Sequence, residues 1–168
     1  MTKDEFLKDI NPWGSHRALL WTALESTTDS PFPVVELGCG DNSTPQLTKY
    51  CKDTQRILFS YDSNKEWADK FDTDYVKDWE KHPLWLSKYS VCLLDLAPGE
   101  YRKVALMKIE ADIIVLHDSE IPGWNASDYK VRPLFRNFKF YKDDVPKEKG
   151  QPWTTALSNT VDVTKWNV

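Results

Sequence analysis

A short glycine-containing segment near residue 40 combines residue types that suit a nucleotide-like ligand. The segment reads Glu36-Leu37-Gly38-Cys39-Gly40-Asp41-Asn42-Ser43 and follows a β-prone run. Two glycines let the backbone approach a ligand closely, and the start of a following helix offers unpaired N–H groups. Asp62 follows Gly40 at close to the spacing of about 20 residues at which an acidic side chain meets ribose hydroxyls. Together these features predict a nucleotide-like ligand.

A second group of polar side chains lies at the ends of two later apolar runs. Asp95 closes the run over 89–95, and His117 and Asp118 close the run over 111–117. If the runs are parallel strands, their ends meet at the edge of the sheet where open α/β proteins bind ligands. His117 is then the best candidate for a general base. We therefore assign Asp95, His117 and Asp118 as candidate catalytic residues.

The spacing of apolar residues predicts the elements that must position these side chains. Strand-like and helix-like segments alternate, which indicates parallel crossovers, and the apolar strands imply burial on both faces of a sheet. We predict an α/β fold with a doubly wound, mostly parallel seven-stranded sheet, helices on both faces and a C-terminal antiparallel hairpin. The expected strands are 33–37, 56–61, 74–76, 89–95, 111–117, 139–142 and 154–158, and the expected helices are 16–24 with Ser15 as N-cap, 43–51 with a capping box of Ser43 and Gln46, 64–71 and 101–110.

Length and composition limit the classes of function. The chain has 168 residues, 40% of them hydrophobic and 29% charged, which predicts one domain over 1–168. Residues 1–30 are expected to form a helical segment over the ligand cleft. The net charge of −4 makes nucleic acid an unlikely partner. The charged N-terminus and the absence of long apolar runs predict a cytoplasmic protein without a membrane partner, and the three cysteines match neither a disulfide framework nor a zinc site.

The segment Glu36-Leu37-Gly38-Cys39-Gly40, followed by Asp62, resembles the first motif of the class I S-adenosylmethionine-dependent methyltransferases. The resemblance implies a Rossmann-like fold that binds S-adenosylmethionine. Asn42 stands where many members have a third glycine, and Ser43 stands where a nicotinamide-binding fold would prefer glycine. The cofactor-binding residues that the resemblance implies are Glu36, Gly38, Cys39, Gly40, Asn42, Asp62 and Asp78.

Two of the implied sites have alternatives that the residues leave open. Asp78 follows the third strand, where the family often contacts adenine, but it could equally cap the next segment. Asp95 and Asp118 resemble the strand ends at which catechol-type O-methyltransferases bind Mg²⁺, although Ser119 replaces the family's Asn. A bond from Asp118 to Arg102 or Arg132 is the alternative, and we expect no metal.

The acceptor of the methyl group is expected to be a small molecule, sugar or metabolite. The segment Asp95-Leu96-Ala97-Pro98-Gly99 lacks the paired prolines and aromatic residue with which DNA amino-methyltransferases hold a flipped base. Residues 13–17 should close over the carboxylate end of the cofactor, and residues 98–102 and 119–129 should hold the acceptor. The alternatives are a non-catalytic S-adenosylmethionine-binding or nucleotide-binding module and an NAD(P)-dependent oxidoreductase.

Overall fold

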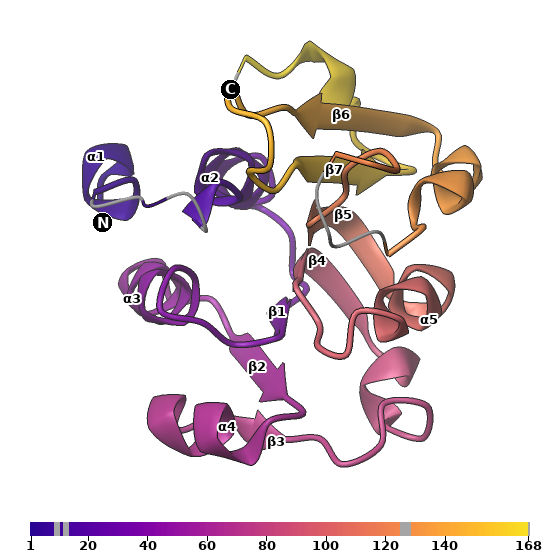
Figure 1. Cartoon of the computed structure of the whole chain (residues 1–168). Helices are drawn as coiled ribbons and strands as arrows, with labels where there is room; N and C mark the ends of the chain where they lie inside the picture. Colours follow the sequence, from indigo (N-terminus) through magenta and orange to yellow (C-terminus); the bar gives the residue numbers. More distant parts are fainter. Residues whose placement is uncertain (9–10, 12–13, 125–128, 168) are drawn as a thin grey trace.

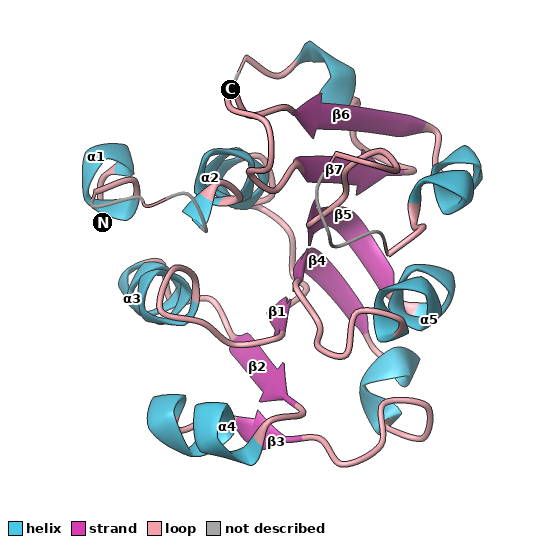
Figure 2. Ribbon diagram, viewed as in Figure 1, coloured by secondary structure: helices cyan, strands magenta, loops and turns pink. Residues whose placement is uncertain are grey.

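A seven-stranded sheet forms the centre of the computed structural model, which describes residues 1–8, 11, 14–124 and 129–167 (Figures 1 and 2). The order of the strands is β3-β2-β1-β4-β5-β7-β6. The first five strands of the chain run parallel, and β7 runs antiparallel to both β5 and β6. The predicted fold class is therefore confirmed. The strands are β1 (Val34–Leu37), β2 (Leu58–Asp62), β3 (Asp74–Tyr75), β4 (Lys88–Leu94), β5 (Glu110–His117), β6 (Phe140–Asp144) and β7 (Thr154–Ser158).

Helices cover both faces of this sheet. Figures 1 and 2 show α2, α3 and α4 on one side of the strands and α5 on the other. The helices are α1 (Lys3–Phe6), α2 (Arg17–Glu25), α3 (Thr44–Asp53), α4 (Lys65–Phe71) and α5 (Tyr101–Lys108), with short 3₁₀ helices at Pro83–Leu86, Arg132–Asn137 and Val163–Lys165.

Each face of the sheet carries its own hydrophobic core. Successive side chains of a strand point to opposite faces, so Val34 packs with Leu19 and Leu47 of α2 and α3. The next residue, Val35, packs in the other core with Leu106 of α5. The four residues of β1 are all buried, as a central parallel strand requires.

The strand order reverses between β1 and β4, and this reversal positions the site. β1 lies between β2 and β4, so the chain leaves β1 toward one edge and later returns to its other side. The loops that follow β1 and β4 therefore diverge to opposite faces. In open α/β sheets the crevice at such a point is where ligands bind.

The structure corrects several expected element ends. α2 begins at Arg17 with His16 as N-cap, because the Ser15 side chain bonds to other parts of the chain. Ser43 is the N-cap of α3 but makes no capping hydrogen bond, so the expected capping box is absent. α5 ends at Lys108, since Ile109 is already extended.

Candidate functional site

A cavity of about 390 Å³ opens beside the carboxyl ends of β1, β4 and β5. It brings together predicted residues from three parts of the chain, namely residues 40–43, Asp95 and the pair His117 and Asp118. His16 and Trp67 also line it. His16 belongs to the segment 13–17 that was expected to close over the cofactor, whereas Trp67 was not predicted. The strand-end rule does not indicate Trp67, because this residue lies on α4. Trp13, expected to cover this cleft, lies outside the described residues.

The two glycines of the loop after β1 have different roles. Gly38 has a φ of +96°, and a Cβ there would lie 2.2 Å from the carbonyl oxygen of Asp95. Its lack of a side chain thus lets β1 pack against the end of β4. A Cβ on Gly40 would meet only Ser43 Oγ, at 3.7 Å, and Gly40 lines the cavity. Gly40 is the glycine that leaves room for a ligand.

Glu36 supports the loop after β1 through a hydrogen bond to Thr44. Its side chain is fully buried, and Oε1 accepts a hydrogen bond of 3.0 Å from Thr44 Oγ1. Thr44 Oγ1 in turn accepts one of 2.9 Å from the N–H of Gly40. Burial raises the pKa of Glu36 to about 7, against hydrogen bonds that lower it. Glu36 does not line the cavity, so its contribution to binding would be through the position of Gly40.

Asp62 joins the end of β2 to the same loop. Its Oδ2 accepts a hydrogen bond of 2.7 Å from the N–H of Cys39, and Oδ1 accepts one of 2.6 Å from the N–H of Asn64. A carboxylate oxygen can accept a second bond, so ribose hydroxyls could still bind there. Burial raises the pKa of the Cys39 thiol to about 12, which leaves no nucleophilic thiolate at neutral pH.

Among the predicted cofactor-binding residues, Gly40 and Asn42 line the cavity, whereas Glu36, Gly38, Cys39, Asp62 and Asp78 do not. Asp78 follows β3. Its Oδ1 accepts a hydrogen bond of 3.0 Å from the N–H of Glu80, and its Oδ2 lies 3.1 Å from Lys81 Nζ. These contacts are those of a capped turn, which is the alternative that the sequence left open.

Arg102 of α5 organises the acidic side of the cavity. It is 3% exposed and donates hydrogen bonds of 2.7 Å to Asp95 Oδ1 and 2.9 Å to Asp118 Oδ2. It also donates to the carbonyl oxygen of His117 at 2.7 Å. Asp118 adopts a φ of +54°, a left-handed conformation that Asp tolerates better than most residues. Arg102 thus ties the ends of β4 and β5 together and is not available to hold an acceptor.

His117 is positioned between the two carboxylates. Its Nδ1 lies 3.2 Å from Asp95 Oδ2 and 3.9 Å from Asp118 Oδ1. Burial alone would lower the pKa of His117, but the carboxylates raise it above its usual value. Burial would likewise raise the pKa of Asp95, but the charges of His117 and Arg102 lower it. The expected role of His117 as a general base stays a prediction.

The three side chains also have the spacing of a metal site. Ligand atoms of Asp95, His117 and Asp118 lie within 4.8 Å of one another. Arg102 bonds to Asp95 Oδ1 and Asp118 Oδ2. The second oxygen of each carboxylate, Asp95 Oδ2 and Asp118 Oδ1, lies toward His117 Nδ1. The expectation that the site holds no metal stays a prediction.

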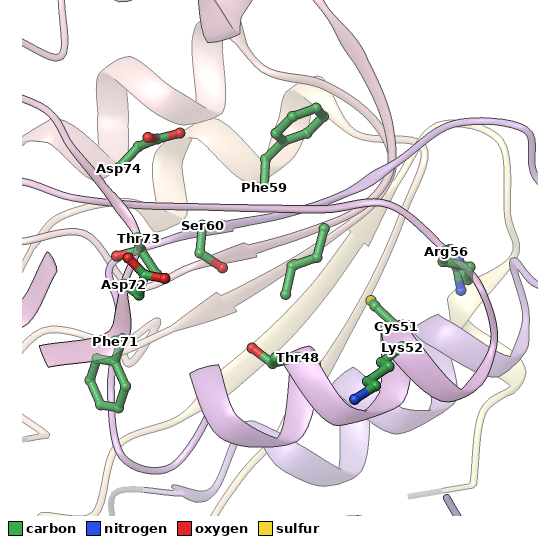
Figure 3. Close-up of a pocket in the computed structure, with 11 residues that line it drawn as sticks. Thr48, Cys51, Lys52, Arg56, Phe59, Ser60, Phe71, Asp72, Thr73 and Asp74 are labelled. Atoms are coloured by element: carbon green, nitrogen blue, oxygen red, sulfur yellow. The ribbon is translucent and has the colours of Figure 1, made fainter. Parts of the chain in front are cut away.

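A second cavity, of about 450 Å³, lies between α3, β2 and the segment that leads into β3 (Figure 3). Its lining includes Thr48 and Lys52 of α3, together with Asp72 and Asp74. None of the predicted site residues lines it. Burial raises the pKa of Cys51, which borders this cavity, to about 11, so it offers no reactive thiolate at neutral pH.

Comparison with solved structures identifies the class of fold. The crystal structure of a SAM dependent methyltransferase from Archaeoglobus fulgidus aligns with 83% of this chain and 93% of its own, at 13% identity and a TM-score of 0.50. The plantazolicin methyltransferase BpumL, in complex with SAH and a desmethylPZN analog, aligns with 95% of this chain and 88% of its own, at 12% identity and a TM-score of 0.54.

A third structure, the methyltransferase domain of bacterial CtHen1-C, aligns over 90% of this chain and 100% of its own, with 10% identity and a TM-score of 0.53. The chain thus has the fold of the class I S-adenosylmethionine-dependent methyltransferases, as the first motif suggested. The protein-family models and curated protein sequences compared with the chain give no match.

Proposed function

We propose that the protein is an S-adenosylmethionine-dependent methyltransferase that acts on a small molecule, sugar or metabolite. The observation that carries the proposal is the cavity at the reversal of strand order, bordered by Gly40 and open beside the loop that Asp62 holds. The shared fold supports it, since a structure of that fold is known in complex with SAH. The proposed cofactor-binding residues remain those of the first motif together with Asp62.

Three carboxylates line the cavity, those of Asp41, Asp95 and Asp118. Each is paired within the chain, Asp41 with Lys70 at 2.6 Å and the other two with Arg102. When bound, S-adenosylmethionine supplies a methyl group on a positively charged sulfonium sulfur.

The chain's own residues contribute mainly position. Asp62 would bind the ribose, residues 40–43 would face the amino-acid part of the cofactor, and Arg102 would keep the ends of β4 and β5 rigid. Holding an acceptor in line with the methyl group can supply much of the rate enhancement without covalent help. The segment after β5 borders a further cavity of about 520 Å³, lined by Glu120, Pro122 and Lys130 among others, a size that suits a small acceptor.

The net charge of −4 agrees with a small acceptor, because it does not favour the phosphate backbone of a nucleic acid. Separately, the helices among the described residues are too short or too polar to span a bilayer.

The proposal is tested by calorimetry with S-adenosylhomocysteine. Wild type should bind it, and Gly40→Val should weaken binding by about tenfold or more, because the added side chain extends into the cavity while the fold has space for its Cβ. Thr48→Val is the matched control, since Thr48 lines the separate cavity of Figure 3. Absence of binding to wild type, or equal loss in both variants, would contradict the proposed site.

A non-catalytic binding module is the second candidate. The observation that favours it is the position of His117 Nδ1 near two carboxylates, which raise the pKa of the ring and so make it a more strongly protonated group than an isolated histidine. A screen of methyl transfer across hydroxyl, amine and thiol acceptors separates the two functions. Product from any acceptor supports the enzyme, whereas cofactor binding without product across all three classes supports the module.

A further inference from the structure

A hydrogen bond between the loops after β2 and β4 crosses the point where the strand order reverses. Ser63, the first residue after β2, donates its hydroxyl proton to the carbonyl oxygen of Ala97 in the loop after β4. β1 lies between these two strands in the sheet (Figure 1). A contact that joins the two outer loops must therefore pass over the carboxyl end of β1. We call this contact the interloop bond.

The interloop bond separates two parts of the proposed cofactor site. Among the described residues, Gly40 and Asn42 line the cavity, whereas Asp62 does not and is 7% exposed. A cofactor that reaches both the cavity and the carboxylate of Asp62 has to lie across the end of β1. No ring of a ligand fits between two atoms that are hydrogen-bonded to each other. The interloop bond and the nucleoside part of such a ligand therefore compete for the same space.

Each of the two loops is also held by contacts of its own. Asp62 Oδ1 accepts a hydrogen bond of 2.6 Å from the N–H of Asn64, which follows Ser63. In the loop after β4, the carbonyl oxygen of Leu96 accepts one of 3.0 Å from Arg102 Nε. Loss of the Ser63 hydroxyl would leave both of these contacts in place. The interloop bond thus controls the separation of the loops rather than the structure of either loop.

The interloop bond is weak enough to open. It lies at the exposed surface, so water can bond to both groups once they separate. For this reason the net contribution of one such bond changes a ratio of populations by only about 2- to 10-fold. A contact of this strength lowers the fraction of open molecules without preventing a ligand from entering.

We propose that the interloop bond is an autoinhibitory contact, which must break before the nucleoside part of the cofactor binds between the two loops. The inference rests on the proposed function, because it concerns access to the same site. If only the open form binds, the apparent dissociation constant is the intrinsic constant divided by the open fraction. An autoinhibitory hydroxyl therefore weakens binding, whereas a hydroxyl that contacts the ligand strengthens it.

The test is the sign of the change in affinity when the hydroxyl is removed. In calorimetry, Ser63→Ala should bind S-adenosylhomocysteine about 2- to 10-fold more tightly than wild type does. 5′-Methylthioadenosine keeps the nucleoside and lacks the amino-acid part, and its affinity should rise by the same factor. Ser30→Ala is the matched control, because Ser30 Oγ also bonds to a distant segment, at 3.1 Å from Asp112 Oδ2, and Ser30 does not line the cavity. Its affinities should equal those of wild type.

Rapid-mixing kinetics give a second readout. Ser63→Ala should raise the association rate constant for S-adenosylhomocysteine by the factor seen in calorimetry and leave the dissociation rate constant unchanged, because only the open fraction differs. If wild type binds and Ser63→Ala binds equally or more weakly, the autoinhibitory role is wrong and the proposed function stands. If neither protein binds S-adenosylhomocysteine, the proposed function and this inference fail together.

Discussion

At the scale of single residues, Arg102 is the cation on which the charge balance of the site depends. Asp95 and Asp118 both accept hydrogen bonds from it, and without it they would face each other with only His117 between them. Removing one partner of a buried ion pair is much more costly than removing an exposed one, because a buried charge is left without compensation. The fold is therefore expected to depend on this one guanidinium.

We expect Arg102→Met to lower the free energy of unfolding by about 3–5 kcal/mol. Urea unfolding followed by circular dichroism measures this change. Lys70→Met is the matched control, because Lys70 pairs with Asp41 at 2.6 Å but is 49% exposed, and its loss should be within about 1 kcal/mol. Similar losses in the two variants would show that the Arg102 network contributes no more than a surface pair.

The two histidines of the cavity show how the pKa values of neighbouring residues of one type can shift in opposite directions. His117 is flanked by carboxylates, whereas His16 faces a carbonyl oxygen and the ring of His117. Burial opposes the charged form in both rings, and only His117 has anions close enough to overcome it. The chemical role of each histidine follows from these partners.

At the scale of elements, the contact between the ends of β1 and β4 positions the loops that border the cavity. Gly38 donates its N–H to the carbonyl oxygen of Tyr61 in β2 at 2.9 Å. The position of a Cβ at Gly38 is occupied on its other side by the backbone of Asp95. Three neighbouring strand ends therefore meet around one residue that has no side chain.

Gly38→Ala should lower the free energy of unfolding by about 2–5 kcal/mol, as the sum of left-handed backbone strain and overpacking. Gly123→Ala is the control, since Gly123 also has a positive φ but a Cβ at that residue would have nothing within 4 Å; it should lose only about 1–2 kcal/mol. Denaturant titrations of wild type, Gly38→Ala and Gly123→Ala measure these losses. Equal losses would mean that Gly38 serves only as a turn.

The segment before α2 is the other element that shapes the cavity. Ser15 Oγ lies 3.2 Å from His117 Nε2 and 3.1 Å from the carbonyl oxygen of Pro152, to which it donates. Arg17 donates to the carbonyl oxygens of Asn42 and Lys8, each at 2.7 Å. These contacts join the N-terminal segment to the glycine loop, to β5 and to the chain before β7.

At the scale of the whole molecule, several buried titrations act together on stability. The pKa values of Glu36 and His117 are raised in the folded state. Their contributions to stability are therefore present below the usual pKa of each group and are lost as the pH rises through its folded-state pKa. The pKa of His16 is lowered to about 3, so its contribution is lost as the pH falls below 6.5. The pKa of Asp95 is lowered, so its contribution to stability is lost as the pH falls below its usual value of 3.8. Stability should therefore be greatest at mildly acidic to neutral pH.

Glu36→Gln tests the alkaline side of this profile. At pH 5 the variant and wild type should have similar free energies of unfolding, because Glu36 is protonated in the folded state. At pH 8 the variant should be more stable by up to about 3 kcal/mol, since it no longer places a carboxylate in the core. Urea unfolding at the two pH values measures the difference. A difference that does not change with pH would contradict the raised pKa of Glu36.

The order of the elements could be predicted because it depends on local patterns. Apolar runs such as residues 89–95 and 111–117 are β-prone, glycine follows β1, and helical spacing fills the intervals between strands. The ends of parallel strands meet at one edge by geometry alone. The sequence was therefore enough to place Asp95, His117 and Asp118 beside the glycine loop.

The charge states and partners within the cavity were decided only by the tertiary structure. Ser15 and His117 are 102 positions apart, and the contact of His16 with Asn42 spans 26. No local pattern encodes such pairs, because they depend on how α2 and α5 pack against the sheet. The sequence by itself determined the fold and the edge at which the site lies. Long-range packing determined that Arg102 binds the carboxylates, that Glu36 is buried beneath the loop, and that the pKa of His117 is raised while that of His16 is lowered. These shifts require the folded chain, because burial and neighbouring charge exist only there.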